Sequence, residues 1–349
     1  MKVNIDEFEI SNSSKVFIIA ELSANHNQSI DIAKQTIKAA KRSGADAIKF
    51  QTYTPDTITI DSKKEDFIIR GTIWNDENYY SLYKRAYTPW EWHEELFNFA
   101  HDEDLICFST PFDKSSVDLL EKLNTPAYKI ASFEITDIPL IKYIASKGKP
   151  VILSTGIADE EDISLALSTI RNCGNNQIIL LKCTSSYPAP IEEANLCMIK
   201  EFSDRFNVLS GLSDHTIGSI VPIMSIGFGC RVIEKHLILD KNIGGPDSSF
   251  SMDEKEFTEM VDQVRIAEKS IGKISFNLTE KQMKGRDFSR SLYVVEDVKK
   301  GDIISEKNVR SIRPGFGLHP KYFPDVLGKR FKENIEKGTR FNLDFMEKK

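Results

Sequence analysis

IILLKCTSSYPAPIEEANLCMIKEFSDRFNVLSGLSDHT, residues 178–216, decides the fold. It has an apolar run at each end and a polar segment of helical pattern between them. Buried strands that alternate with helices indicate a parallel sheet, because each helix returns the chain to the same edge of the sheet. The second run ends in Ser213, Asp214 and His215, which are able to bind a ligand, where a Gly or Pro turn would be ordinary.

Six further runs of the same kind occur along the chain. They are VFIIAELS (16–23), AIKFQT (47–52), LICFSTPF (105–112), AYKIAS (127–132), PVILSTG (150–156) and RVIEKHL (231–237). Eight strands that alternate with helices favour closure into a (β/α)₈ TIM barrel, and an open doubly wound sheet is the alternative. Helix start signals, Asp159 before EEDISLALSTI and the stretch Thr88-Pro89-Trp90-Glu91, fix the strand-to-helix direction.

Two segments depart from this regular alternation. The connection over residues 53–87 is far longer than usual, and it predicts a lid or specificity element, with a packed surface excursion as the alternative. After the barrel, which we expect to span residues 1–272, residues 273–288 are polar and rich in Lys, as in a linker. Short strand-like runs and turns over residues 289–349 then predict a small β-rich domain.

The composition is that of a soluble protein that acts on small molecules. A net charge of -6 and a pI near 5.7, without a basic stripe, argue against binding to nucleic acid or to an acidic membrane. Cys107, Cys183 and Cys230 lie within apolar runs, which favours buried, reduced thiols. The first ten residues lack an apolar signal core, and the longest apolar stretch, 220–230, is too short to cross a bilayer. We therefore expect a cytoplasmic location.

Nearly every predicted strand ends in a hydroxyl, a cation or a carboxylate, at the edge where a barrel carries its active site. These strand-end residues include Glu21, Ser23, Lys49, Gln51, Thr110, Lys129, Ser132, Ser154, 184–186, 213–215 and 234–236. A single Ser or Thr there often caps the next helix instead. The buried ammonium groups of Lys49 and Lys129 would lack a counter-charge unless an anion neutralised them. Together with the hydroxyls they predict a phosphate or carboxylate site.

His215 and His236 end two strands that are neighbours in a barrel, so their imidazoles can converge. Two His side chains completed by water form an open site for a divalent Lewis acid, with Asp214 or another nearby carboxylate to orient a ring or to add a ligand. Satisfied core histidines and a His acid–base pair are the alternatives. Glu21 is a candidate base or cation stabiliser, because a carboxylate that ends an apolar strand is seldom there for packing.

With these residues assembled, the chain resembles the phosphoenolpyruvate-condensing sialic acid synthases over essentially its whole length. The motifs that carry the resemblance are IIAELSANHNQS, GADAIKFQTYTPD, STPFD, KIASFEITDIPL, KPVILSTG, CTSSYPAP, GLSDHTIG, EKHLILDKN, GPDSSFS, RSLYVVEDVKKGD and IRPGFG. Within this family ELSANHN, the GTIW segment and YTPWEWH are most similar to the pseudaminic acid synthases. Ser185 and the GPDSS stretch depart from the N-acetylneuraminate synthase pattern. The C-terminal domain resembles the antifreeze-like, or SAF, domain of these enzymes.

The resemblance implies a role for each matching position. His215 and His236 match the protein ligands of Mn²⁺ or Mg²⁺. In the mechanism that we expect, Glu21, with Glu134 as a weaker candidate, stabilises the cationic intermediate and deprotonates the attacking water. The implied phosphoenolpyruvate pocket consists of Lys49, Thr110, Lys129, Ser132, Ser154 and Ser213. The implied sugar contacts are Gln51, Tyr187, Asp247 and Arg313, and Asp247 also matches a carboxylate near the metal site. In such enzymes the residue that Arg313 matches reaches in from the SAF domain of the partner subunit.

The implied reaction joins phosphoenolpyruvate to 2,4-diacetamido-2,4,6-trideoxy-L-altrose and yields pseudaminic acid and phosphate by C–O cleavage. The resemblance also implies a domain-swapped homodimer and a product used in flagellin or surface glycosylation. N-acetylneuraminate and legionaminate synthesis are alternatives with the same mechanism. The residues also leave open a pyruvate aldolase with a Schiff base on Lys129 or Lys49, and a non-catalytic carbohydrate-binding protein.

Overall fold

The computed structural model describes residues 1–347, and it contains a closed barrel of eight parallel strands. The strands are β3 (Phe17–Glu21), β4 (Ala47–Thr52), β5 (Ile106–Pro111), β6 (Tyr128–Ile130), β7 (Val151–Ser154), β8 (Ile178–Cys183), β9 (Leu209–Asp214) and β10 (Val232–His236). They pair in sequence order, and β10 closes the ring against β3. The prediction of a (β/α)₈ barrel is therefore confirmed, and all eight predicted runs contain a barrel strand.

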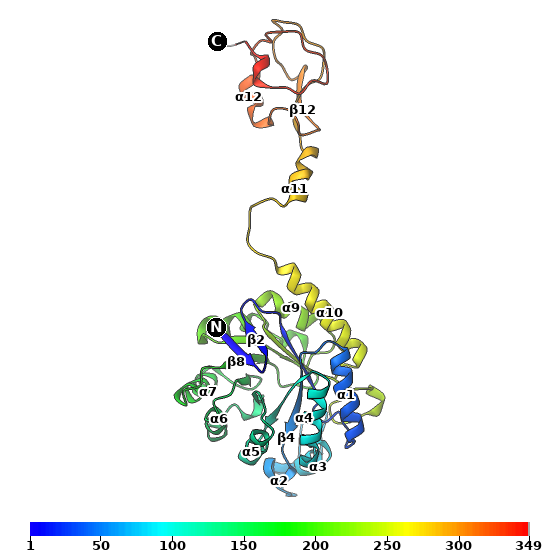
Figure 1. Ribbon diagram of the computed structural model, residues 1–349, viewed down its shortest axis with the longest axis vertical. Coiled ribbons are helices and arrows are strands. Elements are labelled where there is room, and N and C mark those ends of the chain that lie inside the picture. The colour runs from blue at the N-terminus through cyan, green and yellow to red at the C-terminus, as the bar shows by residue number, and fades with distance from the viewer. Residues whose placement is uncertain (348–349) are drawn as a thin grey trace. The chain divides into compact units, whose positions relative to one another are not determined.

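Helices follow the strands and surround the barrel, as Figure 1 shows. They are α1 (Ile30–Arg42), α4 (His93–Asp102), α5 (Lys114–Lys122), α6 (Ile138–Ala145), α7 (Glu160–Asn172), α8 (Cys197–Phe206), α9 (Ile220–Ser225) and α10 (Glu254–Ile271). Asp159 caps α7 in a capping box, as predicted. The predicted cap at Thr88 is wrong, because a 3₁₀ turn precedes α4 and the buried Thr88 hydroxyl lies 3.2 Å from His26 Nε2 instead.

An N-terminal hairpin that we did not expect precedes the barrel. Strands β1 (Lys2–Ile5) and β2 (Phe8–Ser11) pair antiparallel. Their buried Val3, Ile5 and Ile10 pack with Phe17 and Phe108, whose side chains lie inside the barrel. This apolar cluster is separate from the larger one between strands and helices. The hairpin therefore closes one end of the barrel, and the carboxyl ends of the strands stay open at the other.

The long connection after β4 carries structure of its own. It contains the short helix α2 (Pro55–Ile58), a 3₁₀ turn at Glu65–Phe67 and the helix α3 (Tyr79–Ala86). Asn78 caps α3 through its side chain. The indole Nε1 of Trp74 donates a hydrogen bond to the backbone oxygen of Pro246, 3.0 Å away. This connection is therefore tied to the loop that follows β10, on the open side of the barrel.

Contacts divide the chain into Met1–Gly272 and a second unit that begins at Lys273. The predicted linker, residues 273–288, contains the helix α11 (Glu280–Gly285). Beyond it β11 (Ser291–Val294) and β12 (Val309–Ile312) pair antiparallel, followed by the short helix α12 (Phe323–Val326). Their small apolar core contains Val294, Phe331 and Phe341, and the β-rich character that we predicted for this unit is confirmed.

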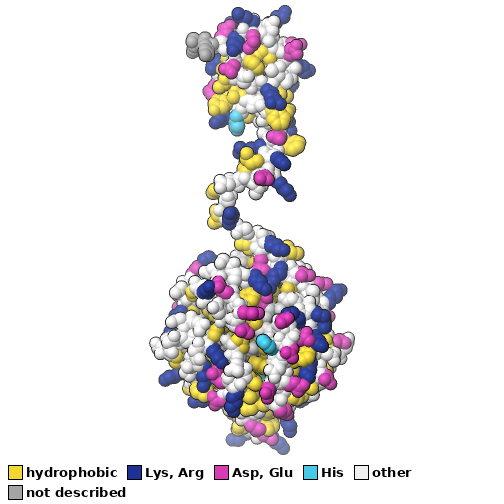
Figure 2. Space-filling view, in the orientation of Figure 1, with side chains coloured by type: hydrophobic (Ala, Val, Ile, Leu, Met, Phe, Trp, Pro, Cys, Tyr) yellow, Lys and Arg dark blue, Asp and Glu magenta, His cyan; other side chains and the backbone are white. Residues whose placement is uncertain are grey.

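The surface carries both signs of charge. In the face that Figure 2 shows, Lys and Arg alternate with Asp and Glu over the barrel, without a continuous basic stripe. Within residues 1–347 no helix has the length and apolar character needed to span a bilayer.

Candidate active site

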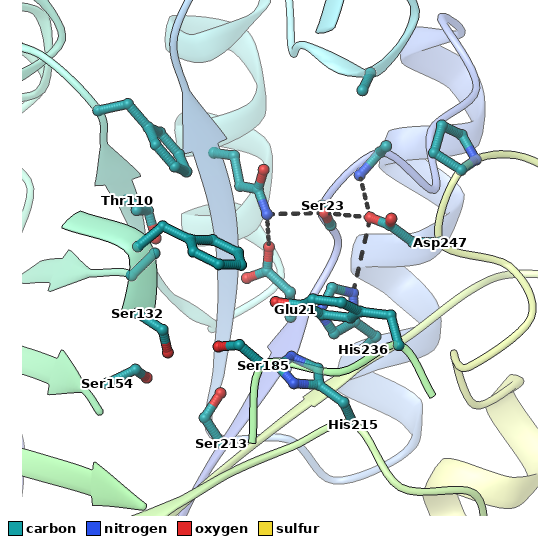
Figure 3. A pocket seen from close by; sticks show the side chains of 18 of the residues that line it. Glu21, Ser23, Thr110, Ser132, Ser154, Ser185, Ser213, His215, His236 and Asp247 are labelled. Atoms are coloured by element: carbon teal, nitrogen blue, oxygen red, sulfur yellow. Dashed lines mark hydrogen bonds and ion pairs between the residues drawn. The ribbon is translucent and has the colours of Figure 1, made fainter. Parts of the chain in front are cut away.

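A cavity of about 520 Å³ opens at the carboxyl ends of the barrel strands. Figure 3 shows side chains from β3, β5, β7 and β9 and from the following loops directed into it. All of the predicted site residues except Arg313 line this cavity. They are Glu21, Lys49, Gln51, Thr110, Lys129, Ser132, Glu134, Ser154, Tyr187, Ser213, His215, His236 and Asp247.

The floor of the cavity carries a buried network of charges. Lys49 Nζ forms an ion pair with Glu21 and lies 3.7 Å from Glu234 Oε1. Lys129 Nζ lies 3.8 Å from the same Glu234 oxygen. Burial raises the pKa of Glu234, but the charges of Lys129 and Lys49 outweigh it and hold that pKa below its usual value. Glu234 therefore bridges the two ammonium groups as a carboxylate.

This network corrects one premise of the sequence argument. We expected Lys49 and Lys129 to lack counter-charges unless an anion bound, but Glu21 and Glu234 supply two carboxylates. The pairs cross between strands, and Glu21 is the in-register neighbour of Lys49 on β3 and β4. The floor is thus nearly neutral by itself, and an incoming anion needs the hydroxyl donors as well as the cations.

Hydroxyl groups surround the two ammonium groups. Lys49 Nζ donates to Thr110 Oγ1 at 3.1 Å, and Lys129 Nζ donates to Ser154 Oγ at 2.7 Å. Ser132 Oγ accepts from the backbone N–H of Gly156 at 3.0 Å. At Gly156 a Cβ would lie 2.1 Å from Ser185 Oγ, so glycine is needed there for close approach. The result is a cradle of cations and hydroxyls suited to phosphate and carboxylate oxygens.

Two carboxyl groups in the cavity have raised pKa values. Burial, reinforced by the charge of Glu234, raises the pKa of Glu21 to about 7 despite Lys49. Burial likewise raises the pKa of Glu134 to about 7, and one of its oxygens has no hydrogen-bond partner. Both groups therefore exchange protons near neutral pH, which is the property that general acid–base catalysis requires.

His215 and His236 converge at one side of the cavity (Figure 3), with ring centroids 5.3 Å apart. His215 Nδ1 donates to the backbone oxygen of Thr184 at 3.1 Å, which leaves Nε2 free as an electron-pair donor. His236 Nδ1 is buried without a hydrogen-bond partner, 4.0 Å from Asp247 Oδ2. Burial and the nearby cations lower the pKa of His236 well below its usual value, so this ring is neutral.

Two imidazole nitrogens and a carboxylate at this spacing fit an open divalent cation site. No group of three or more His, Cys, Asp or Glu side chains within the described part of the chain has the arrangement of a complete metal site. A cation here would therefore depend on water or substrate for its other ligands. The orphaned Nδ1 of His236 supports such a ligand, because a buried imidazole nitrogen without a partner is costly.

The carboxylate beside the histidines is Asp247 and not Asp214, which we had named first. Asp214 faces away from the cavity because side chains alternate along a strand, and Ser213 and His215 on either side of it face inward. Its carboxylate pairs with Lys235 instead. Asp247 accepts a hydrogen bond from Ser23 Oγ at 2.5 Å, and burial raises its pKa.

The residues expected to contact the sugar are divided between the two units. Gln51 Nε2 donates to Ser23 Oγ at 2.8 Å and to Glu21 Oε1 at 3.1 Å, near the charged floor. The Tyr187 ring lies 4.5 Å from the His215 ring, between centroids. Arg313 follows β12 in the second unit and is exposed, so its predicted contact stays a prediction.

Several lining residues were not predicted as site residues. Ser23 and Glu234 ended predicted strands, and a stricter use of the two-residue alternation would have selected them. Trp74 and Phe250 come from loops, where the sequence offers no periodic signal. The Trp74 and Tyr187 rings lie 5.5 Å apart, and Phe250 lies 5.0 Å from the His236 ring. Tyr187 and Phe250 thus lie against the two histidines, and Trp74 lies against Tyr187.

Comparisons with known proteins agree with this architecture. The chain matches the model of the NeuB family over residues 36–275 and that of the SAF domain over residues 289–341. It is 51% identical over 324 residues to a pseudaminic acid synthase of Campylobacter jejuni, covering 93% of this chain and 94% of the relative. It is 46% identical to a pseudaminic acid synthase of Helicobacter pylori, covering 95% and 98%.

Among solved structures, the spore coat polysaccharide biosynthesis protein SpsE of Bacillus subtilis matches with a TM-score of 0.68 and 33% identity. That match covers 100% of both chains. The family model spans most of the barrel, the SAF model spans the second unit, and the two curated relatives match along nearly their whole length. This chain belongs to the NeuB family and carries a SAF domain.

Proposed function

We propose that this protein is a pseudaminic acid synthase, which joins phosphoenolpyruvate to 2,4-diacetamido-2,4,6-trideoxy-L-altrose and releases phosphate. The observation that carries the proposal is one cavity in which a cradle of cations and hydroxyls lies beside an open pair of histidines. The first feature suits an enol phosphate, and the second suits the carbonyl group of a sugar. The identity of 51% to a protein named pseudaminic acid synthase supports the choice of sugar.

Phosphoenolpyruvate binds in the cradle on the floor of the cavity. Lys49 and Lys129 neutralise its phosphate and carboxylate, and the remaining oxygens accept hydrogen bonds from the hydroxyl side chains. These hydroxyl donors are Thr110, Ser132, Ser154 and Ser213. The buried carboxylates Glu21 and Glu234 keep Lys49 charged before substrate arrives, because their charges outweigh the effect of burial and raise its pKa.

His215 and His236 hold a divalent cation, Mn²⁺ or Mg²⁺, with Asp247 beside them. When bound, this cation supplies Lewis acidity that makes the open-chain aldehyde of the sugar more electrophilic. The hydrogen bond from His215 Nδ1 to the Thr184 carbonyl fixes the ring so that its other nitrogen is available. Tyr187 packs against the His215 ring, with the ring centroids 4.5 Å apart.

Carbon 3 of phosphoenolpyruvate forms a bond to the aldehyde carbon and leaves positive charge on carbon 2. The carboxylate of Glu21 stabilises that charge and accepts a proton from the water that adds to carbon 2. The resulting tetrahedral centre breaks its C–O bond to phosphate and becomes a 2-keto acid. Overall, one proton from water ends on the new sugar hydroxyl and the other leaves with the phosphate, while the water oxygen becomes the 2-keto oxygen. Glu134 is the second candidate for this proton transfer.

One observation favours a second candidate, a pyruvate aldolase with a Schiff base. Burial lowers the pKa of Lys129 even though Glu234 raises it, and a neutral amine is what imine formation requires. Sodium borohydride with pyruvate would then trap a covalent adduct on Lys129, which a mass increase of the intact protein detects. We expect no adduct, because Ser154, Ile130 O and Glu234 all surround the ammonium form.

The decisive experiment measures phosphate release from phosphoenolpyruvate in the presence of Mn²⁺. Three sugars are compared: the diacetamido altrose, its legionaminate-pathway isomer and N-acetylmannosamine, each with and without chelator. Release with the altrose alone, abolished by chelator, supports the whole proposal. Release with another sugar keeps the reaction class and assigns a legionaminate or N-acetylneuraminate synthase instead. Release with none of them overturns the proposal and favours the aldolase or a non-catalytic carbohydrate-binding protein.

The quaternary arrangement is part of the proposal. A domain-swapped homodimer would bring Arg313 of one chain to the sugar in the cavity of its partner. Ile274 and Phe276 support an additional contact, because their side chains are 99% and 100% exposed. Light scattering should give twice the chain mass, and Arg313→Ala should raise the KM for the sugar with little change for phosphoenolpyruvate. We also propose a cytoplasmic location for the enzyme.

A further inference from the structure

We infer that the buried ion pair between Asp214 and Lys235 positions His215 relative to His236. The inference rests on the proposed metal role of the two histidines. Asp214 and Lys235 do not line the cavity, so they act through their neighbours and are positioning residues. Each lies next to a histidine in the chain, and they are in-register partners on the adjacent strands β9 and β10.

The pair is the centre of a closed set of hydrogen bonds. Lys235 Nζ donates to Asp214 Oδ2 at 2.5 Å and to the backbone oxygen of Thr216 at 2.5 Å. The Asp214 carboxylate also accepts from Thr216, from the backbone N–H at 3.1 Å and from Oγ1 at 2.9 Å. Asp214, Lys235 and Thr216 are nearly inaccessible to solvent, with exposed fractions of 4%, 1% and 2%. The bonds therefore enclose residues 214–216, with His215 in the middle.

The two histidines differ in how the backbone holds them. His236 is the last residue of β10, and pairing with β3 fixes it there opposite Glu21. His215 lies one residue beyond β9, where regular structure has ended. Its backbone is held by a hydrogen bond from Ala189 N–H to its oxygen, 3.0 Å long. Lys235 adds a link from the rigid strand β10 to both residues that flank His215.

Stability alone is a poor explanation for this pair. A buried ion pair costs desolvation and is often no better for stability than apolar residues of similar size. Its location, one residue from each proposed metal ligand, is better explained by geometry, because metal sites need ligand orientation fixed by surrounding groups. The surrounding groups of His215 are then the Thr184 carbonyl on one side and the Asp214–Lys235 pair on the other.

The test uses the double variant D214N/K235M in the full-length protein. It removes both charges together, which avoids leaving one buried charge unpaired, and it cuts the link between β10 and the turn. Mn²⁺ affinity is measured without substrates, from the electron paramagnetic resonance signal of free Mn²⁺. We expect the Kd for Mn²⁺ to rise by about 10-fold or more, as for other changes around metal ligands. A Kd within twofold of the parent value overturns the inference.

A matched control separates positioning from lost stability. Arg265 and Asp46 form an ion pair of 2.8 Å before β4, at the other end of the barrel. D46N/R265M should lower the Tm without changing the Kd for Mn²⁺, and an equal rise in Kd would contradict the inference.

A second variant, Thr216→Val, serves if D214N/K235M does not fold. It replaces only the hydroxyl that bonds to Asp214 and should still weaken Mn²⁺ binding several-fold. An unchanged Kd in Thr216→Val would contradict the inference. A parent protein that binds no Mn²⁺ overturns the inference, while phosphate release by the parent tests the proposed function separately.

Discussion

Glu21 and Lys49 form a buried ion pair on neighbouring strands at the floor of the cavity, with side-chain exposures of 1% and 4%. The ion pair determines the protonation of both residues. The carboxylate keeps Lys49 charged in a site that burial would otherwise neutralise, and Lys49 limits the rise in the pKa of Glu21 to about 7. Proton transfer at Glu21 is thereby set close to neutral pH.

The first prediction concerns the pH dependence of the reaction. Below pH 7 Glu21 is mostly protonated and is no base, so kcat/KM should rise as pH rises through about 7. Glu21→Gln should lower kcat by at least about 100-fold and remove this rise. Glu134→Gln, the matched control, should keep it, although Glu134 also has a pKa of about 7. A rise that survives in Glu21→Gln and disappears in Glu134→Gln would assign the base to Glu134.

The second prediction concerns the sugar. Trp74 lines the cavity, lies 5.5 Å from the Tyr187 ring and is fixed by its bond to Pro246 O. Its indole presents apolar surface suited to the methyl groups of a diacetamido trideoxy sugar. Trp74→Ala should lower kcat/KM for that sugar by about 10-fold or more, from the lost apolar contact. Trp74→Phe should retain most activity, and the KM for phosphoenolpyruvate should not change. An unchanged kcat/KM for the diacetamido sugar in Trp74→Ala would show that Trp74 does not contact it.

The third prediction concerns the anion cradle. A Cβ at position 156 would lie 2.1 Å from Ser185 Oγ and 2.8 Å from Ser132 Oγ. Gly156→Ala should displace the Ser132 hydroxyl and raise the KM for phosphoenolpyruvate about 10-fold, the value of one hydrogen bond to a charged group. Gly227→Ala is the control, because no atom lies within 4 Å of its added Cβ. Steady-state kinetics with each substrate varied in turn measure both variants, and equal KM values would exclude Ser132 from the cradle.

Much of the barrel could be predicted because its signals are local. A buried parallel strand is a continuous apolar run, and all eight were visible before any contact was known. The hairpin β1–β2 was missed because its strands, Lys2–Ile5 and Phe8–Ser11, have four residues each and alternate with polar side chains. Its reason for forming is the apolar end of the barrel on which it packs, and that surface exists only after folding.

The candidate site was predictable where it depends on strand ends and not where it depends on register. Lys49, Lys129 and Glu21 were found, but the pairing of the two lysines with Glu21 and Glu234 was not, because an ion pair between strands requires knowing which residues are opposite each other. We assigned Asp214 to the cavity because we treated Ser213, Asp214 and His215 as one polar group that faces the same way. The two-residue alternation sends it outward to Lys235, and Asp247 arrives from a loop distant in sequence.

The last prediction concerns acid stability, and it uses histidines outside the cavity. His26 and His93 are fully buried, and their rings contact Thr88 and Thr52 at 3.2 and 2.8 Å. Burial lowers the pKa of each to about 4, against about 6.5 in an unfolded chain. Between these values the unfolded state binds more protons, so the free energy of unfolding falls as pH falls from 6.5 to 4. Each histidine contributes roughly 3 kcal/mol to that loss, because its pKa differs by about 2.5 between the folded and the unfolded state.

Urea unfolding at several pH values between 7 and 4.5 measures this dependence. The parent protein should lose stability steadily below pH 6.5, and the double variant H26Q/H93Q should lose less over the same range, whatever its stability at pH 7. His101→Gln is the control, because His101 is an exposed residue of α4 and its replacement should leave the slope unchanged. Parallel curves for the parent and the double variant would show that these two rings accept protons in the folded protein and that another group causes acid unfolding.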